Sequence, residues 1–230
     1  MKAMRSLGLL VAFAILLSLL LSAPDVGASN PAAPIIDPHG QPYGKSYGQW
    51  SAEWWQWVLS FPFDTNPLFQ DGAVDCSLGA AGRVWFLAGA LGSGTYNRTC
   101  TVPNNVALFF PVANMIAWAT EPEETYEGML AIATDAVNTV YDIQADVDGV
   151  AVQNLNRYRV TSPGPFAITI PEGGIVDAGT YSPAASDGYY LMLAPLSPGQ
   201  HTVHIHAVWP GWGTMDVTYT LTVSRTPGVP

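Results

Sequence analysis

The stretch MDVTYTLTVS, Met215 to Ser224, decides the fold class, because its side chains alternate between apolar and polar. Every residue between two apolar ones is an aspartate or a threonine. The apolar set comprises Met215, Val217, Tyr219, Leu221 and Val223. A period of two places these side chains on one face of a β-strand and the polar ones on the other. The pattern predicts an antiparallel strand with one buried face and one face in water.

Further strands are expected at short spacing before this stretch. GYYLMLAPLSPGQHTVHIHAVW, residues 188–209, predicts two strands joined through a Pro-Gly turn, and IQADVDGVAVQ, residues 143–153, predicts a hairpin turning at Asp148-Gly149. Together with shorter apolar runs, this amounts to about eight or nine strands. The sequence therefore predicts a mostly β protein: an antiparallel β-sandwich, immunoglobulin-like or jelly-roll-like, with two accessory α-helices.

The first expected helix lies near residues 46–60 and contains four of the eight tryptophans of the chain. Ser46, with Gln49 three residues later, matches a capping box at its start. On a helical wheel Trp50, Trp54 and Trp57 gather on one stripe, whereas Glu53 lies on the opposite side. Helix-spaced aromatics of this kind are typical of a core. We expect the indoles to pack this helix onto the sandwich and Glu53 to face water.

The second expected helix lies near residues 122–141. Its apolar residues recur at helical spacing, and four glutamates gather close to its start. Negative charge at that position is favourable because the helix dipole is positive there. These carboxylates therefore need no catalytic explanation.

The N-terminal residues predict export. Residues 1–28 have a basic start, an apolar run over 7–21 and small residues at the processing positions, as in a cleavable signal peptide. The alternative is an uncleaved membrane anchor. Residues 29–45 are rich in proline and glycine and predict an extended arm, and residues 46–230 form a single domain. We expect a secreted protein, extracellular or periplasmic, without a stable membrane span after cleavage.

The charge of the chain excludes one class of partner. It carries 8 basic and 18 acidic residues, so nucleic-acid phosphates and anionic lipid headgroups would repel it. Nucleic acid is therefore not an expected partner. Because 49% of residues are hydrophobic and only 11% are charged, the chain should fold around a core rather than remain disordered.

Cys76 and Cys100 both lie in the exported part of the chain. Two cysteines in an oxidising compartment most simply form a disulfide. The alternative is two buried free thiols. Asn97 begins an Asn-Arg-Thr sequence, which is a glycosylation acceptor only in a host that modifies such sites.

Two histidines near the C-terminus form a candidate metal site. His204 and His206 are two residues apart on an expected strand, so their side chains share one face about 7 Å apart. Such a pair suits zinc or copper, with Asp216 as a third ligand. Pairing of the last two strands is expected to place the histidines near Thr220 and Thr218. The alternative is a solvated polar face that binds no metal.

Three tryptophans form a candidate ligand-binding site. Trp209 and Trp212 flank a tight turn at one end of the expected sandwich, where binding loops of such folds gather. Exposed indoles can stack on sugar rings or hold a protein partner. The alternative role is to cover the open end of the core. Trp55, at the border of the buried helical stripe, is the third candidate.

No catalytic residue is predicted. The segment around Ser93 lacks the strand-turn-helix context of a nucleophile elbow, and paired cysteines are not nucleophiles. No phosphate-binding glycine loop follows an expected strand. The sequence therefore favours a protein that is not an enzyme.

Several segments together resemble a group of secreted bacterial proteins. They are YGQWSAEWWQWVLSFP, NPLF, DCS, VWFLAG, RTCTVP, ALFFPVAN and DGYYLMLAPLSPGQHTVHIHA, which in this order span most of the exported chain. The resemblance implies a bacterial exported protein and supports pairing of Cys76 with Cys100. It implies no activity, ligand or catalytic residue.

The functional expectation is a secreted, non-catalytic protein that binds an extracellular ligand, either a polysaccharide or a cell-surface component such as a protein. Two alternatives remain open at this point. One is a metal-binding protein or metalloenzyme that uses His204 and His206 with zinc or copper, and the other is a secreted hydrolase. The favoured expectation requires no cofactor.

Overall fold

The computed structural model describes residues 34–225 of the chain. The predicted signal peptide lies outside the described residues, as does the first part of the predicted arm. The rest of the arm runs along the five-stranded sheet, where the Ile36 amide donates to the Met192 carbonyl at 2.8 Å. No helix among residues 34–225 has the length and apolar character needed to cross a membrane.

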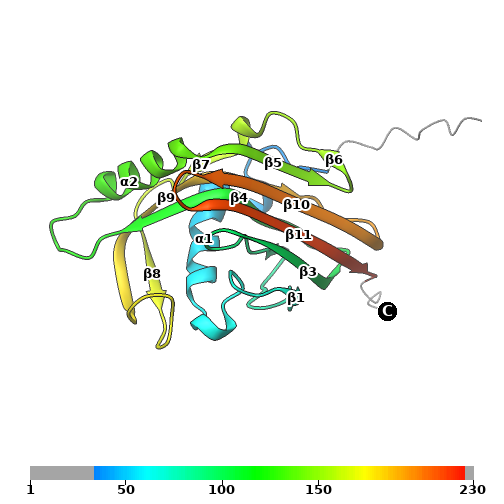
Figure 1. The fold of residues 1–230 in the computed structure, drawn as a ribbon, viewed down its shortest axis with the longest axis horizontal. Coiled ribbons are helices and arrows are strands. Elements are labelled where there is room, and N and C mark those ends of the chain that lie inside the picture. The colour runs from blue at the N-terminus through cyan, green and yellow to red at the C-terminus, as the bar shows by residue number, and fades with distance from the viewer. Residues whose placement is uncertain (1–33, 226–230) are drawn as a thin grey trace, which may run out of the picture. The chain divides into compact units, whose positions relative to one another are not determined.

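Two β-sheets form most of the fold (Figure 1). The six-stranded sheet has the order β1 (Gly72–Ala73), β3 (Gly94–Pro103), β11 (Gly213–Ser224), β10 (Gly199–Trp209), β5 (Tyr141–Val147) and β6 (Val150–Ala151). The five-stranded sheet has the order β2 (Val84–Phe86), β4 (Ala107–Trp118), β9 (Gly179–Leu193) and β7 (Arg159–Thr161), and β8 (Phe166–Ile170) also pairs with β9. The last strand, β11, therefore lies inside its sheet rather than at an edge.

The predicted mostly β, sandwich-like fold with two α-helices is confirmed, but its sheets are mixed rather than purely antiparallel. β3 runs parallel to both β1 and β11, and β2 runs parallel to β4. Alternation of side chains indicates which face of a strand is buried but not the direction of its neighbour. The parallel pairs join segments that are distant in the sequence, so no turn motif predicts them.

The hairpin of β10 and β11 differs from the expected one by its register. His204 lies opposite Thr218, and His206 lies opposite Asp216. Each histidine thus faces the residue two positions nearer the turn than predicted. The reason is that the turn is centred on Gly211, one residue earlier than the expected pairing requires.

The helix α1 (Tyr47–Leu59) begins with the predicted capping box, in which Ser46 and Gln49 bond each other's backbone amides. Trp54 is fully buried and donates from Nε1 to the Leu87 carbonyl at 2.9 Å. Its ring lies 6.4 Å from that of Tyr190 on β9. The helix is therefore part of the core, as expected.

The inner strands of the five-stranded sheet, β4 and β9, contain nearly continuous runs of buried residues, Ala107–Ala113 and Ala184–Leu193. A strand needs cover on both faces to be buried in this way. Contacts of α1 with β4 and β9 supply one layer, and contacts of β4 with β5 and β10 supply the other. Trp50, Trp54 and Trp55 thus complete the core, whereas Trp57 is only partly buried against it. Glu53 lies at the surface in an ion pair with Lys45.

The helix α2 (Tyr126–Thr139) begins later than predicted and packs against β4 and β9. Thr125 caps it by accepting the amide of Gly128 at 3.2 Å. Glu124 instead holds the preceding turn, since its carboxylate accepts the amides of Thr120 and Glu121. These backbone hydrogen bonds lower the pKa of Glu124. Three short 3-10 helices complete the fold: η1 (Pro42–Gly44), η2 (Phe63–Thr65) and η3 (Leu155–Tyr158).

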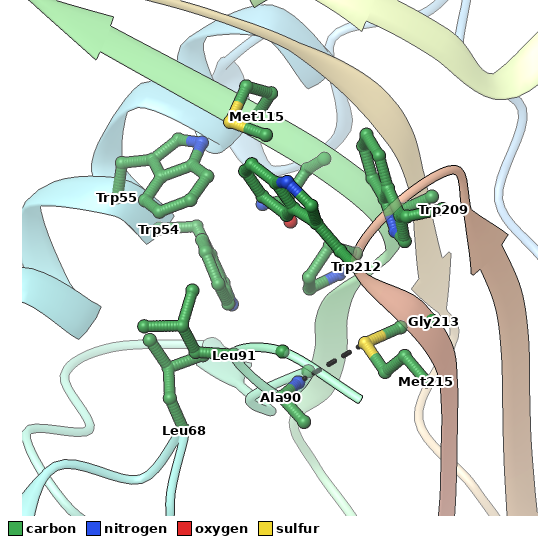
Figure 2. A pocket seen from close by; sticks show the side chains of 15 residues that line it. Trp54, Trp55, Leu68, Ala90, Leu91, Met115, Trp209, Trp212, Gly213 and Met215 are labelled. Carbon is green, nitrogen blue, oxygen red and sulfur yellow. Dashed lines mark hydrogen bonds between the residues drawn. The ribbon is translucent and has the colours of Figure 1, made fainter. Parts of the chain in front are cut away.

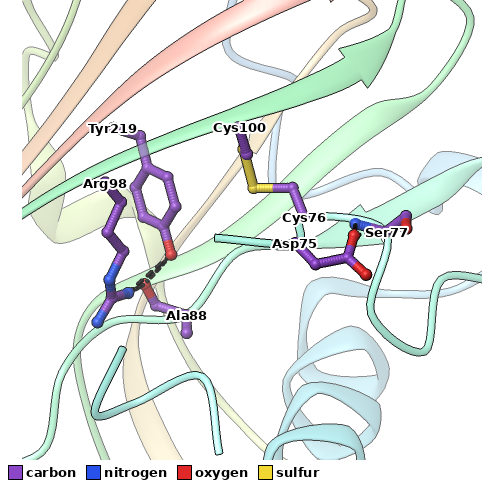
Figure 3. The surroundings of a disulfide bond; sticks show 7 residues. All are labelled: Asp75, Cys76, Ser77, Ala88, Arg98, Cys100 and Tyr219. Atoms are coloured by element: carbon purple, nitrogen blue, oxygen red, sulfur yellow. Dashed lines mark hydrogen bonds between the residues drawn. A yellow bond between two sulfur atoms is a disulfide. The ribbon is translucent and has the colours of Figure 1, made fainter. Parts of the chain in front are cut away.

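The predicted disulfide is present and joins the loop after β1 to strand β3 (Figure 3). Cys76, between β1 and β2, is bonded to Cys100 on β3, with 5.8 Å between their Cα atoms. Near it, Arg98 of β3 points into the interior beside Tyr219 of β11 and the Ala88 carbonyl. The segment that follows β2 is thus attached to β3 and β11 by side chains.

Candidate ligand-binding cleft

The three predicted ligand-binding tryptophans line one cleft, although Trp55 is distant in the sequence from Trp209 and Trp212 (Figure 2). Trp55 comes from α1, Trp209 ends β10, and Trp212 lies in the turn before β11. The amide of Trp212 donates to the Trp209 carbonyl at 3.1 Å, which closes the turn. The two indole rings stack with centroids 6.0 Å apart and planes inclined by 24°. The structure therefore brings these residues together, and Trp212 is its most exposed tryptophan, at 57%.

Apolar side chains from other segments complete the walls. Figure 2 shows Trp54, Leu68 and Leu91 grouped on the side of the cleft away from Trp209, and Met115 of β4 beside Trp55. These four residues come from α1, from β4 and from the loops that flank β1 and β2. Their position beside the tryptophans could not be predicted, because a pattern within one segment carries no information about its distant neighbours.

The cleft is small and uncharged. It offers about 70 Å³ to water-sized groups. Complete binding sites for drug-sized ligands enclose roughly 300–1,000 Å³. None of the 15 lining residues has an ionisable side chain. A ligand would therefore insert only a small neutral group, and the rest of it would lie across the exposed indoles.

The polar groups at the cleft are few and poorly paired. The amide of Ala90 donates only to Sδ of Met215, at 3.4 Å, and a thioether is a weak acceptor. Within residues 34–225 the indole N–H groups of Trp209 and Trp212 have no hydrogen-bond partner. Asn114 donates from Nδ2 to the hydroxyl of Tyr190 at 3.1 Å, which leaves its Oδ1 without a partner among the same residues. The cleft thus offers several donors and one side-chain acceptor.

Trp55 is a fixed part of the wall rather than an open surface. Only 8% of the residue is exposed, and its buried Nε1 has no hydrogen-bond partner in the described part of the chain. Burial strongly raises the pKa of the neighbouring Tyr190, and the hydrogen bond from Asn114 only partly opposes that rise. The Tyr190 hydroxyl therefore stays neutral beneath the cleft.

The wall formed by the segment after β2 is held by Arg98. This side chain is almost fully buried and donates from Nη1 to the carbonyls of Ala88 and Gly89 at 2.8 and 2.9 Å. The same nitrogen donates to the hydroxyl of Tyr219 at 2.7 Å. Gly89 lines the cleft, so Arg98 positions one wall from behind.

The predicted metal-ligating residues lie together on the six-stranded sheet. Nε2 of His204 lies 3.2 Å from one carboxylate oxygen of Asp216, and Nδ1 of His206 lies 2.9 Å from the other. Two aspartates of β5 extend this row: Asp146 is 3.0 Å from Nδ1 of His204, and Asp142 is 3.6 Å from Nε2 of His206. These two aspartates were not predicted, because β5 is distant in the chain from β10 and β11. None of the five residues lines the cleft.

Four of these five side chains, those of Asp146, His204, Asp216 and His206, are linked by hydrogen bonds. In the part of the chain that the structure describes, no group of three or more His, Cys, Asp or Glu side chains has an arrangement that could hold a metal ion. Both nitrogens of His204 face carboxylates, Nδ1 that of Asp146 and Nε2 that of Asp216. Burial raises the pKa of Asp216, but hydrogen bonds and positive charge from His206 and His204 outweigh this, so the pKa is lowered overall.

Comparison of the chain with protein-family models, with curated proteins and with solved structures finds no match. The resemblance to secreted bacterial proteins therefore stays a prediction, and the geometry of the cleft is the basis for a functional argument.

Proposed function

We propose that this protein is a non-catalytic binding protein that acts outside the cytoplasm and holds a neutral polysaccharide at the tryptophan cleft. The observation that carries the proposal is the convergence of Trp55, Trp209 and Trp212 on one cleft from two distant parts of the chain. The disulfide between Cys76 and Cys100 supports an oxidising location, extracellular or periplasmic.

The chemistry of the cleft suits a sugar. Indole rings present flat apolar faces that can cover the C–H face of a pyranose, while their N–H groups remain available to hydroxyl oxygens. The absence of ionisable side chains among the lining residues favours a neutral ligand, because a charge would lose its hydration without gaining a counter-charge. Such a site binds and orients a ligand but offers no group for acid–base or nucleophilic chemistry.

A Trp212→Ala variant tests this function. On an array of bacterial and plant polysaccharides we expect the wild-type protein to bind neutral glycans and the variant to bind them about tenfold or more weakly, as for loss of a central interface tryptophan. Because Trp212 is 57% exposed, the melting temperature should change little. Failure of the wild-type protein to bind any glycan would contradict the proposal.

Tyr141→Ala provides the matched control. Tyr141 is an aromatic residue of similar exposure, 56%, on β5, and it does not line the cleft. Its removal should leave glycan binding unchanged. An equal loss of binding in both variants would mean that the tryptophan cleft is not the site.

A further inference from the structure

The size of the cleft restricts the part of a ligand that can enter it. A single water needs roughly 10–15 Å³ in the measure in which the cleft offers about 70 Å³. The space therefore fits a substituent of a few heavy atoms and not a whole sugar ring. A ring must lie at the mouth, against the exposed face of Trp212, with one substituent pointing inward.

The walls require an apolar end on that substituent. Trp54 and Leu68 are buried, and neither turns a free polar atom toward the cleft, since Nε1 of Trp54 is bonded to the Leu87 carbonyl. Leu91, 45% exposed, adds an aliphatic side chain at the same side. A hydroxyl inserted here would lose its hydrogen bonds to water, whereas a methyl group would leave water favourably.

The polar groups around this space complement an amide. The indole N–H of Trp212, which has no hydrogen-bond partner among residues 34–225, can donate to a carbonyl oxygen, and the Ala90 amide in the same cleft is bonded to a thioether sulfur, which is a weak acceptor. Oδ1 of Asn114 can accept from an N–H group. One donor-to-carbonyl contact, one acceptor for an N–H and one methyl-sized apolar space together match an acetamido group.

The absence of charge distinguishes an acetamido group from the charged substituents of other sugars. A free amino sugar carries a positive charge and a uronic acid a negative one, and no side chain that lines the cleft could neutralise either. An acetamido group is neutral. We therefore propose that the cleft recognises N-acetylated hexosamine units, with the acetyl methyl in the apolar space and the pyranose ring on Trp212. The inference rests on the proposed polysaccharide-binding function.

The test compares two neutral oligosaccharides that differ at the 2-position of each ring. Titration of the exported protein, followed by tryptophan fluorescence and calorimetry, should show at least tenfold tighter binding of N,N′,N″,N‴-tetraacetylchitotetraose than of cellotetraose, which has hydroxyl groups instead. Equal binding of the two would overturn the acetamido assignment and leave the polysaccharide-binding function standing. Binding of neither would overturn the acetamido assignment, and the polysaccharide array then tests separately whether the protein binds any polysaccharide.

A Gly89→Ala variant tests the place of the methyl group. An added Cβ would meet Pro111 Cγ at 3.5 Å and Met215 Sδ at 3.8 Å, both ordinary contacts with other lining residues. The variant should keep the wild-type melting temperature and bind the acetylated tetrasaccharide at least fivefold more weakly. Unchanged affinity would place the acetyl group elsewhere.

Gly164→Ala is the control for this substitution. A Cβ at Gly164 would meet nothing within 4 Å, and the residue does not line the cleft. Both variants add one methyl group at a glycine whose backbone a side chain tolerates. A loss of affinity in the control would show that the effect at Gly89 is not local.

Discussion

At the scale of single residues, Arg98 is the most unusual feature of the interior. It is 1% exposed, yet no ion pair found among residues 34–225 includes it. Its guanidinium is instead bonded to backbone carbonyls and to the hydroxyl of Tyr219. The ring of Tyr219 also lies 5.3 Å from its Cζ atom. Oriented carbonyl dipoles and aromatic faces thus replace the water that a buried cation loses.

Replacement of Arg98 by methionine tests this account. The variant keeps much of the side-chain volume but leaves the Gly89 and Gln70 carbonyls without their donors, and unsatisfied buried groups cost about 1–3 kcal/mol each. We expect the free energy of unfolding to fall by about 3–5 kcal/mol, measured by urea denaturation.

Arg83→Met is the comparison for this experiment. Arg83 is exposed, and its guanidinium lies over the ring of Tyr43 at 5.2 Å. Its loss should change the free energy of unfolding by no more than about 1 kcal/mol. Similar losses in the two variants would show that the buried hydrogen bonds of Arg98 contribute little.

At the scale of elements, sequence patterns within one segment correctly predicted the helices and strands that depend on interactions within that segment. The capping box and aromatic stripe of α1 and the alternation in β11 were sufficient to place both elements. The Asp148-Gly149 turn also lies between β5 and β6 as predicted, with positive φ at both residues. The start of α2 was less accurate, because the glutamates before it suggested a longer helix. One of them, Glu124, accepts backbone amides of the preceding turn.

The candidate cleft was predictable only in part. Trp209 and Trp212 were recognised from their place at a tight turn, and Trp55 from its place at the border of a helical stripe. Their meeting depends on how α1 packs beside the end of β10, which is a tertiary relation between segments far apart in the chain. The polar residue at the cleft, Asn114, had no distinguishing sequence signal within β4.

The hairpin of β10 and β11 should contribute stability that depends on pH. The pKa of Asp216 is lowered in the folded state below its ordinary value of 3.8. Its contribution is therefore complete above the unfolded value, and it is lost as pH falls below about 4 through the folded pKa. Between pH 5 and pH 2, thermal denaturation should show a smaller loss of stability in Asp216→Asn than in the wild-type protein.

Asp135→Asn is the control for this pH dependence. Asp135 is exposed on α2, away from the histidines. Its acid profile should therefore follow that of the wild-type protein. Parallel profiles for all three proteins would contradict the role given to Asp216.

At the scale of the whole molecule, topology is the part of the fold that the sequence did not reveal. Met215 to Ser224 of β11 pair in parallel with Gly94 to Pro103 of β3, more than a hundred residues earlier. Periodicity identified β11 as half-buried, but it carries no information about which distant strand lies beside it. This is why an antiparallel sandwich was expected and mixed sheets are found.

The same topology predicts slow folding. Contacts between β3 and β11, and between β4 and β9, close long loops before they add stability. Proteins dominated by such pairings fold in milliseconds to seconds. Stopped-flow refolding followed by intrinsic tryptophan fluorescence should show this range. A microsecond phase that recovers the full native signal would contradict the prediction.

The central position of β11 in the six-stranded sheet also determines when that sheet can be completed during synthesis of the chain. β11 follows every other described strand, yet both β10 and β3 need it as their neighbour. While the ribosome is still adding the preceding residues, β3 has no partner on that side, and the cavity that Tyr219 and Leu221 fill stays open. Completion of the sheet therefore waits for the last strand to emerge.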